Sequence, residues 1–290
     1  MTPPTRDARS ADGAFVDLHM HSTASDGSLP AREVVEAAAR ARLQAIALTD
    51  HDTLAGVPEA TEAGDRLGVR VVPGVELSAH DTGEVHMLGL HISHLDKLES
   101  RLAGFREARR TRAERIVRRL NELGLPVTME GVLEHAGTGA IGRPHVARAI
   151  VSLGRARDQR EAFDRWLGFG KPAYVEKEYL AVRDAIALVH EAGGIAVLAH
   201  PGASASRARL EELRALGLDG VEVRHPSHSA EDIARIGALA EHFNLVPSGG
   251  SDWHGASAGQ RTIGCMNVPA SWLEKQDAFL RERRKRERVA

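Results

Sequence analysis

Cysteine is nearly absent from this chain. Cys265 is the only one among 290 residues, which excludes a disulfide framework and a cysteine-rich zinc module and suits a reducing cytoplasm. Aromatic residues make up only 4%, and no apolar run is long enough to span a bilayer. The first 14 residues are polar and lack the apolar segment of a signal peptide. We therefore expect a disordered lead-in over residues 1–14, followed by a cytoplasmic protein.

Positive and negative charges nearly balance, and the formal net charge is only −2. A protein of this charge has no global basic field with which to bind duplex nucleic acid. The length, with 42% hydrophobic residues, suffices for one large α/β domain or for one domain with an insertion. The unusual feature is histidine, of which there are 15, and the placement of these residues is more informative than their number.

Short apolar strands alternate with amphipathic helices along most of the chain. FVDLHMH at 15–21 and AIALTDHD at 45–52 are typical strand sequences. Residues 69–79 and 85–92 have the pattern of two strands joined by a turn. Repeated strand–helix units of this kind predict a parallel sheet, either open or closed into a barrel.

One long stretch interrupts the alternation. Residues 96–171 have a mostly helical pattern, and the strand–helix alternation resumes after them. We therefore expect an inserted helical subdomain over 96–171. A charged C-terminal helix is predicted over 271–290.

Polar residues of the kinds that bind metals follow the predicted strands. Alternate side chains of a strand share a face, so Asp17, His19 and His21 would lie opposite the apolar residues of the first strand. The later strands end in the same residue types: Asp50, His51, Asp52, Glu76, His86, His200, His225, Asp252 and His254. In a (β/α) barrel the carboxyl ends of all strands open onto one face. The pattern therefore predicts a cluster of imidazoles and carboxylates at that face.

This cluster holds too many candidate ligands for one ion. A structural zinc site needs four ligands, whereas nine or more are available here. Two or three ions that share a carboxylate would fit, and such clusters hold both the attacking and the leaving oxygen of a phosphoryl transfer. Imidazole and carboxylate ligands without cysteine suit Mn²⁺, Zn²⁺ or Fe²⁺. The alternative is that these are ordinary structural histidines at strand ends. This explanation is adequate for any single position, but it accounts poorly for such residues at seven strand ends in succession.

The motifs together resemble the PHP (polymerase and histidinol phosphatase) domain of metal-dependent phosphoesterases. They are DLHMHS, TDHD, GVELS, VHMLG, AHP and SDWHG, in the order of that family, and they extend from Val16 to about Gly255. The resemblance implies an α/β fold, a distorted seven-stranded (β/α) barrel formed by residues 15–95 and 172–270, with the inserted helical subdomain between them. It also implies up to three divalent metal ions, for which Mn²⁺ is our first expectation and Zn²⁺ and Fe²⁺ are the alternatives.

The resemblance also implies which residues hold each ion. The first ion would be bound by His19, His21, Glu76 and Asp252. Glu76 would bridge to a second ion, completed by His86 and His200. A third ion would be bound by Asp26, His51 and His254, although some relatives have a histidine in place of Asp26. Asp17 and Asp50 would orient ligating imidazoles through hydrogen bonds.

Within the family, the helical insertion resembles one branch. The short SDG after the first motif, IGRPHVARAI at 141–150 and GFGKPAYV at 168–175 are similar to enzymes that hydrolyse nucleoside 3′,5′-bisphosphates or trim short 5′-phosphorylated RNA. Arg143 precedes Pro144 at a predicted helix start, where a guanidinium suits a phosphate, although a surface arginine would look the same. Lys171 is a second candidate phosphate contact. His225 would contact phosphate or act as general acid, or would only support the ligands.

The expected activity is hydrolysis of the 3′-phosphate of a nucleoside 3′,5′-bisphosphate, with trimming of short 5′-phosphorylated RNA as a related activity. Three alternatives remain: a histidinol-phosphate phosphatase, a phosphodiesterase acting on longer chains, and a non-catalytic module that metal ions stabilise. The expected partners are a small nucleotide and short RNA, with no membrane and no obligate protein partner.

Overall fold

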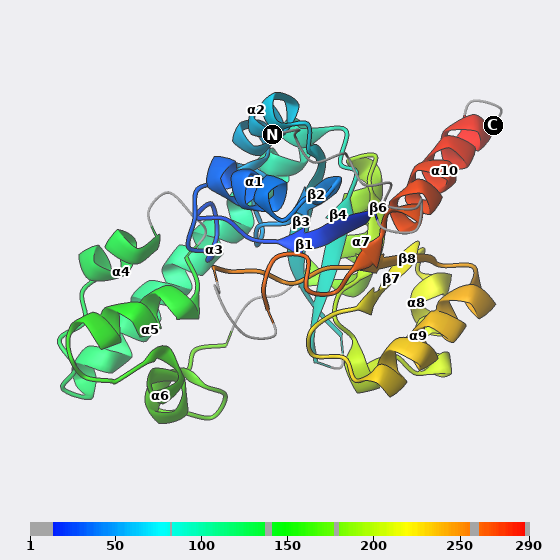
Figure 1. Ribbon diagram of the computed structural model, residues 1–290. Coiled ribbons are helices and arrows are strands. Elements are labelled where there is room, and N and C mark those ends of the chain that lie inside the picture. The colour runs from blue at the N-terminus through cyan, green and yellow to red at the C-terminus, as the bar shows by residue number, and fades with distance from the viewer. Residues whose placement is uncertain (1–13, 82, 137–140, 177–179, 256–260, 288–290) are drawn as a thin grey trace, which may run out of the picture.

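The computed structural model describes residues 14–81, 83–136, 141–176, 180–255 and 261–287 (Figure 1). The lead-in predicted over 1–14 therefore lies outside the described residues, apart from Ala14. The strands are β1 (Phe15–Met20), β2 (Ala45–Leu48), β3 (Arg70–His80), β4 (Glu84–Leu90), β5 (Leu180–Ala181), β6 (Ile195–Leu198), β7 (Gly220–Arg224), β8 (Val246–Gly249) and β9 (Val268–Pro269).

The α-helices are α1 (Ala31–Arg40), α2 (Val57–Leu67), α3 (Leu95–Glu122), α4 (Met129–Ala136), α5 (Arg143–Ser152), α6 (Gln159–Ala162), α7 (Val182–Glu191), α8 (Arg207–Ala215), α9 (Ala230–Phe243) and α10 (Ala270–Glu287). A π-helical turn, η1 (Phe163–Leu167), and a 3-10 turn, η2 (Gly202–Ser204), complete the helical elements of the described residues. None of the helices described here has the length and apolar character needed to cross a membrane.

The strands form one mixed sheet in the order β8-β7-β6-β4-β3-β2-β1-β9, with β5 beside β3. Within the described residues it has nine strands, not seven, because β5 and β9 add two strands of two residues each. Nor is it all parallel, since β4 runs antiparallel to both β3 and β6. Only three residues separate β3 from β4, and so short a connection permits only antiparallel pairing.

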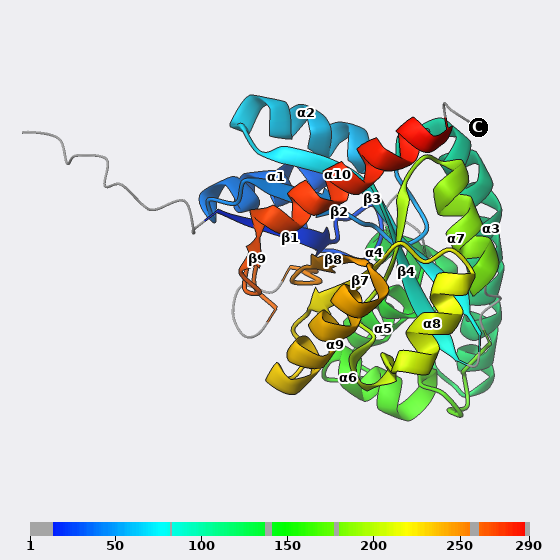
Figure 2. The same ribbon diagram turned by 90° about the vertical axis from the view of Figure 1, so that its right-hand side faces the viewer.

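The sheet curves into a nearly closed barrel (Figures 1 and 2). The chain that follows β8 comes back to the end of β1, where Met20 and Trp253 form an isolated parallel bridge. The main-chain N–H of Asp252 donates to the carbonyl of His19 at 2.9 Å, and that of His21 donates to the carbonyl of Trp253 at 2.9 Å. The residues directly after β8 are therefore bonded to the strand that begins the barrel.

Strand β1 is irregular at the point where its polar residues begin. Its pairing with β2 shifts register between Asp17 and Met20. Val16 and Leu18 pack in one apolar cluster, whereas Met20 packs in another with α1. The strict alternation expected from the sequence therefore ends within the strand, because an extra residue in a bulge turns the following side chains to the other face.

Separate apolar clusters support the barrel and the helical segment beside it. Helices α4 to α6 lie to one side of the barrel in Figure 1, and they share a cluster with the later part of α3 that includes Ile116 and Ile150. The first part of α3 instead contributes Leu98 and Leu102 to a cluster with the barrel strands and α7. Helix α3 therefore packs in both clusters and connects the barrel to the helical segment. Helix α10 covers the barrel through Leu273 and Leu280 (Figure 2).

Candidate metal centre and active site

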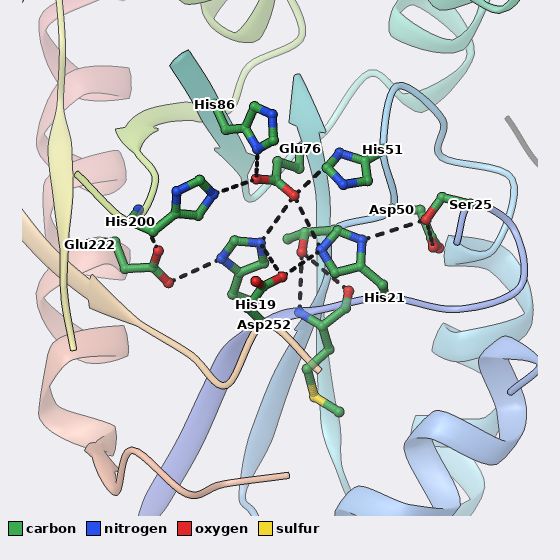
Figure 3. Close-up of polar contacts among 12 residues, drawn as sticks. His19, His21, Ser25, Asp50, His51, Glu76, His86, His200, Glu222 and Asp252 are labelled. Carbon is green, nitrogen blue, oxygen red and sulfur yellow. Dashed lines mark hydrogen bonds and ion pairs between the residues drawn. The ribbon is translucent and has the colours of Figure 1, made fainter. Parts of the chain in front are cut away.

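The predicted ligands converge at one end of the barrel (Figure 3). They come from β1, from the segments that follow β1, β2, β6 and β8, from the middle of β3 and from the first half of β4. The prediction that Glu76 and His86 end their strands is therefore wrong, because β3 and β4 both continue past them. Four groups of imidazoles and carboxylates have ligand atoms within 4.8 Å of one another: His19, His21, Glu76 and Asp252; His21, Asp26, His51 and His254; His51, Glu76 and His86; and His19, Glu222 and His225. The fold thus assembles residues from both ends of the sequence.

Glu76 lies at the centre of the cluster and is only 1% exposed. Five imidazole nitrogens surround its carboxylate: His86 Nδ1 at 2.7 Å and His200 Nε2 at 3.0 Å from Oε1, and His19 Nε2, His21 Nε2 and His51 Nδ1 at 3.2, 3.2 and 3.3 Å from Oε2. Burial opposes the charged form of Glu76, but the imidazoles outweigh it and hold the pKa of the carboxyl well below its usual range. Glu76 therefore remains a carboxylate at neutral pH.

Asp252 provides a second carboxylate beside the first. Its Oδ1 lies 3.5 Å from His19 Nε2 and 3.3 Å from His21 Nε2. The backbone of Asp252 has a φ of +50°, an uncommon conformation for a residue with a side chain. Arg261 also forms an ion pair with its Oδ2. Strain of this kind persists where the surrounding structure holds a side chain in a functional position.

The residues predicted for a third ion are also close together. His254 Nε2 lies 3.1 Å from one oxygen of Asp26, and His51 Nε2 lies 3.9 Å from the other. Burial opposes ionisation of Asp26, but the imidazoles, that of His51 foremost, keep its pKa well below the usual range. His51 faces both carboxylates, because its Nδ1 approaches Glu76 while its Nε2 approaches Asp26.

The donor atoms fit divalent cations. The buried atoms His21 Nε2 and His51 Nδ1 make no hydrogen bond within the described residues, although each lies within 3.3 Å of Glu76 Oε2. Buried polar atoms are normally hydrogen-bonded, so two ring nitrogens directed at one carboxylate without such a bond are typical of metal ligands. The set consists of imidazole and carboxylate groups without a thiolate, which suits Mn²⁺, Zn²⁺ or Fe²⁺.

Glu222 belongs to the cluster of candidate ligands and was missed by the sequence analysis. It is fully buried on β7, where its Oε1 lies 3.1 Å from His19 Nδ1 and its Oε2 accepts the main-chain N–H of His200 at 2.7 Å. A carboxylate on the outer nitrogen of an imidazole fixes the ring, so that Nε2 of His19 points at Glu76. The sequence feature that could have identified Glu222 is its position between Val221 and Val223, because a charge inside an apolar strand requires a buried partner.

Asp50 is connected to the predicted metal ligand His21 through the side chain of Ser25. Its carboxylate accepts hydrogen bonds from the main-chain N–H of Ser22 at 2.8 Å and from Ser25 Oγ at 2.7 Å. Ser25 Oγ in turn lies 3.5 Å from His21 Nδ1. Asp50 is therefore placed to orient the His21 ring through Ser25.

Asp17 contacts main-chain groups and not an imidazole ring. Its Oδ1 accepts the N–H of Ser251 and its Oδ2 the N–H of Gly264, each at 2.9 Å. Ser251 immediately precedes Asp252 in the chain. Asp17 therefore fixes the loop that carries a predicted ligand.

Arg143 lies where a substrate could meet the cluster. It is the first residue of α5, a position that the following Pro144 favours as a helix start. Its guanidinium is half-buried, 5.7 Å from the ring centre of Phe163 and 5.6 Å from that of Tyr174. Within the described residues no carboxylate forms an ion pair with it.

Arg143 lines two pockets beside the predicted ligands. One, of about 170 Å³, also includes Asp26, His51 and His86. The other, of about 380 Å³, includes His86 and His200. Lys171 is exposed and is not among the residues that line either pocket, so its contact with phosphate stays a prediction.

His225 lies beside Asp252 in the buried part of the site. Its Nδ1 lies 2.7 Å from Ser227 Oγ and 3.1 Å from the main-chain nitrogen of Ser227. Its Nε2 lies 3.4 Å from Asp252 Oδ2. Only 1% of the residue is exposed.

The protein belongs to the class of metal-dependent hydrolases, because its nearly closed α/β barrel holds this arrangement of imidazoles and carboxylates. The family can also be stated. The family model described as the PHP domain matches residues 17–176, more than half of the chain, and the chain belongs to this family.

Three relatives with assigned activities cover most of the chain. The 3′,5′-nucleoside bisphosphate phosphatase of Chromobacterium violaceum is 36% identical over 87% of this chain and 91% of its own length. The 5′-3′ exoribonuclease Rnm of Escherichia coli is 37% identical over 82% of this chain and 84% of its own length. The phosphoribosyl 1,2-cyclic phosphate 1,2-diphosphodiesterase of Eggerthella lenta is 39% identical over 88% of this chain and 99% of its own length.

A solved structure has the same fold over nearly the whole chain. It is that of a protein from Bifidobacterium adolescentis described as a metal-dependent phosphoesterase, and it superposes with a TM-score of 0.84 at 33% identity. The match covers 92% of this chain and 96% of the other. The helical segment is therefore part of the shared fold as well as the barrel.

Proposed function

We propose that this chain is a phosphoesterase that removes the 3′-phosphate of nucleoside 3′,5′-bisphosphates, giving a nucleoside 5′-monophosphate and inorganic phosphate. The observation that carries the proposal is the position of Arg143, a cation without an ion-pair partner among the described residues, which lines one pocket with His51 and His86. A substrate with two phosphates would place one at the cluster and the other at Arg143. The names of the relatives from Chromobacterium violaceum and Escherichia coli support this substrate class.

The proposed cofactors are two or three divalent ions, Mn²⁺ in the first place and Zn²⁺ or Fe²⁺ as alternatives. In the proposed assignment, His19, His21, Glu76 and Asp252 hold one ion, Glu76, His86 and His200 a second, and Asp26, His51 and His254 a third. Such ions act as Lewis acids toward phosphate oxygens and lower the pKa of water toward neutrality.

The side chains around the cluster would orient the substrate and supply a proton. Arg143 would bind the 5′-phosphate through two N–H groups, as a planar guanidinium binds phosphate. This contact would place the 3′-phosphorus beside Glu76 for attack by water. As an imidazolium, His225 could donate its Nε2 proton, which faces Asp252, to the departing 3′-oxygen. In this proposal residues 96–171 form an inserted subdomain that brings Arg143 to the barrel.

The same orientation would account for trimming of short RNA from its 5′ end. In a 5′-phosphorylated oligonucleotide, the first internucleotide phosphorus occupies the place of the 3′-phosphate. Water attack on it would release a 5′-monophosphate and leave a 5′-phosphate on the next nucleotide. Both reactions would require the 5′-phosphate, because an unfilled anion site loses the positioning that makes the attack effective.

Cyclic phosphodiester hydrolysis is a second candidate function. The relative from Eggerthella lenta has 39% identity, and the match covers 99% of its length. Its substrate, as its name describes it, also carries more than one phosphate group, so Arg143 could serve there too. Histidinol phosphate is disfavoured, because its single phosphate leaves Arg143 without a partner.

A single substrate screen in Mn²⁺ distinguishes these functions. We expect the highest kcat/KM on a nucleoside 3′,5′-bisphosphate and cleavage of 5′-phosphorylated but not 5′-hydroxyl RNA. Phosphoribosyl 1,2-cyclic phosphate and histidinol phosphate are the comparison substrates. A preference for either would replace the proposed substrate, and no hydrolysis of any of them would favour the non-catalytic module.

A further inference from the structure

Helix α5 contacts the loop that carries Asp26 through two side chains. His145 is fully buried, and its Nε2–H donates to the carbonyl of Ser25 at 3.1 Å. Arg148, three residues further along the helix, donates to the carbonyl of Asp26 at 2.7 Å. Two consecutive carbonyls of one loop are thus bound by one face of one helix. None of the sequence motifs assigned a role to either side chain.

His145 uses both ring nitrogens, each on the main chain of a different segment. Its Nδ1 accepts the N–H of Gly142 at 2.9 Å, while its Nε2 faces Ser25 on the other side. Burial, together with the positive charge of Arg148, lowers the pKa of His145 to about 4. The ring is therefore neutral at pH 7, as it must be for one nitrogen to accept and the other to donate.

The two ends of this contact belong to different parts of the site. On one side, α5 begins with Arg143, the proposed anchor for the 5′-phosphate. On the other side, Asp26 faces His254 at 3.1 Å, and Ser25 bonds to Asp50 at 2.7 Å. A shift of α5 against this loop would therefore change the distance between the guanidinium and the Asp26 carboxylate.

We propose that His145 and Arg148 are positioning residues that hold Arg143 and Asp26 at a fixed separation, and so match the site to substrates with two suitably spaced phosphates. The part of this inference that concerns Arg143 rests on the proposed function. The part that concerns Asp26 rests on the hydrogen bonds that His145 and Arg148 donate to the carbonyls of Ser25 and Asp26. This second part can be tested by metal binding alone.

Paired substitutions separate the two bonds of His145. In His145→Asn, the side-chain oxygen can replace Nδ1 as acceptor for Gly142, but the side chain is too short to reach Ser25. In His145→Gln, the longer amide can donate to the Ser25 carbonyl in place of Nε2. Arg148→Ala removes the second bond at a half-buried position and leaves His145 in place. Arg155→Ala, an exposed arginine in the turn that follows the same helix, is the matched control.

We expect Mn²⁺ affinity, measured by chelator competition, to fall about 10- to 100-fold in His145→Asn and Arg148→Ala. The preference for a nucleoside bisphosphate over nitrophenyl phosphate should fall about tenfold or more. His145→Gln should stay closer to the parent protein, and Arg155→Ala should match it.

Unchanged metal affinity and substrate preference in folded Arg148→Ala would overturn the inference, even if the melting temperature fell, because a merely structural contact would affect stability alone. If the parent protein did not hydrolyse bisphosphates, the proposed function would fail. The metal-affinity measurement would then still decide the role of His145 and Arg148 toward Asp26.

Discussion

Glu76→Gln is expected to lose metal content and activity together, with kcat/KM on a nucleoside bisphosphate falling at least about 10³-fold. The carboxylate of Glu76 is the group on which five imidazole nitrogens converge within 3.3 Å. An amide of the same shape removes the negative charge and replaces one oxygen with an NH₂ group, which has no lone pair for a cation. The measurements are metal per chain by elemental analysis and kcat/KM under one Mn²⁺ condition.

Glu241→Gln is the matched control, because Glu241 is an exposed glutamate on α9 away from the cluster. It should keep the metal content and the rate of the parent protein. Parent levels of both quantities in Glu76→Gln would mean that this carboxylate is not the centre of the metal site.

Arg143→Ala should impair the bisphosphate but spare a simple monoester such as nitrophenyl phosphate. A lost charge-assisted contact is worth about 1.5–3 kcal/mol, which corresponds to about a 10- to 150-fold loss in kcat/KM. The monoester carries no second phosphate, so it gains nothing from the guanidinium near Phe163 and Tyr174. The measurement is the ratio of kcat/KM for the two substrates.

Arg143→Lys should fall between the parent protein and Arg143→Ala, because an ammonium retains the charge but not the two parallel N–H groups. Arg157→Ala, at an exposed position that pairs with Glu161, is the control and should leave the ratio unchanged. An equal loss on both substrates in Arg143→Ala would assign this residue to catalysis or folding instead of to a second phosphate.

Much of the site could be predicted because many of the ligands follow strand ends. The segments after barrel strands meet at one face, so His21, His51 and Asp252 could be placed together despite their separation in sequence. Glu76 and His86 lie instead within β3 and β4. The family and the class of phosphoester hydrolase, which the motifs predicted, are confirmed by the family match and by the relatives. The roles of the individual site residues stay predictions.

Other features of the fold and the site could not be predicted, because the alternation of apolar and polar residues along a strand does not reveal them. The bulge in β1 removes Met20 from the cluster of Val16 and Leu18, and one-dimensional alternation cannot reveal a bulge. Glu222 ends no strand, and its importance appears only when the folded barrel brings its carboxylate to 3.1 Å from His19 Nδ1. The strands β5 and β9 have two residues each, too few for any periodicity.

The central claim is the orientation of the substrate, with the 3′-phosphate at the cluster and the 5′-phosphate at Arg143. The most direct test is hydrolysis of a nucleoside 3′,5′-bisphosphate in ¹⁸O-labelled water, followed by chromatography and mass analysis of the products. The account predicts a nucleoside 5′-monophosphate without label and inorganic phosphate that carries it. A nucleoside 3′-monophosphate as the product would contradict the account, because the 5′-phosphate would then lie at the cluster.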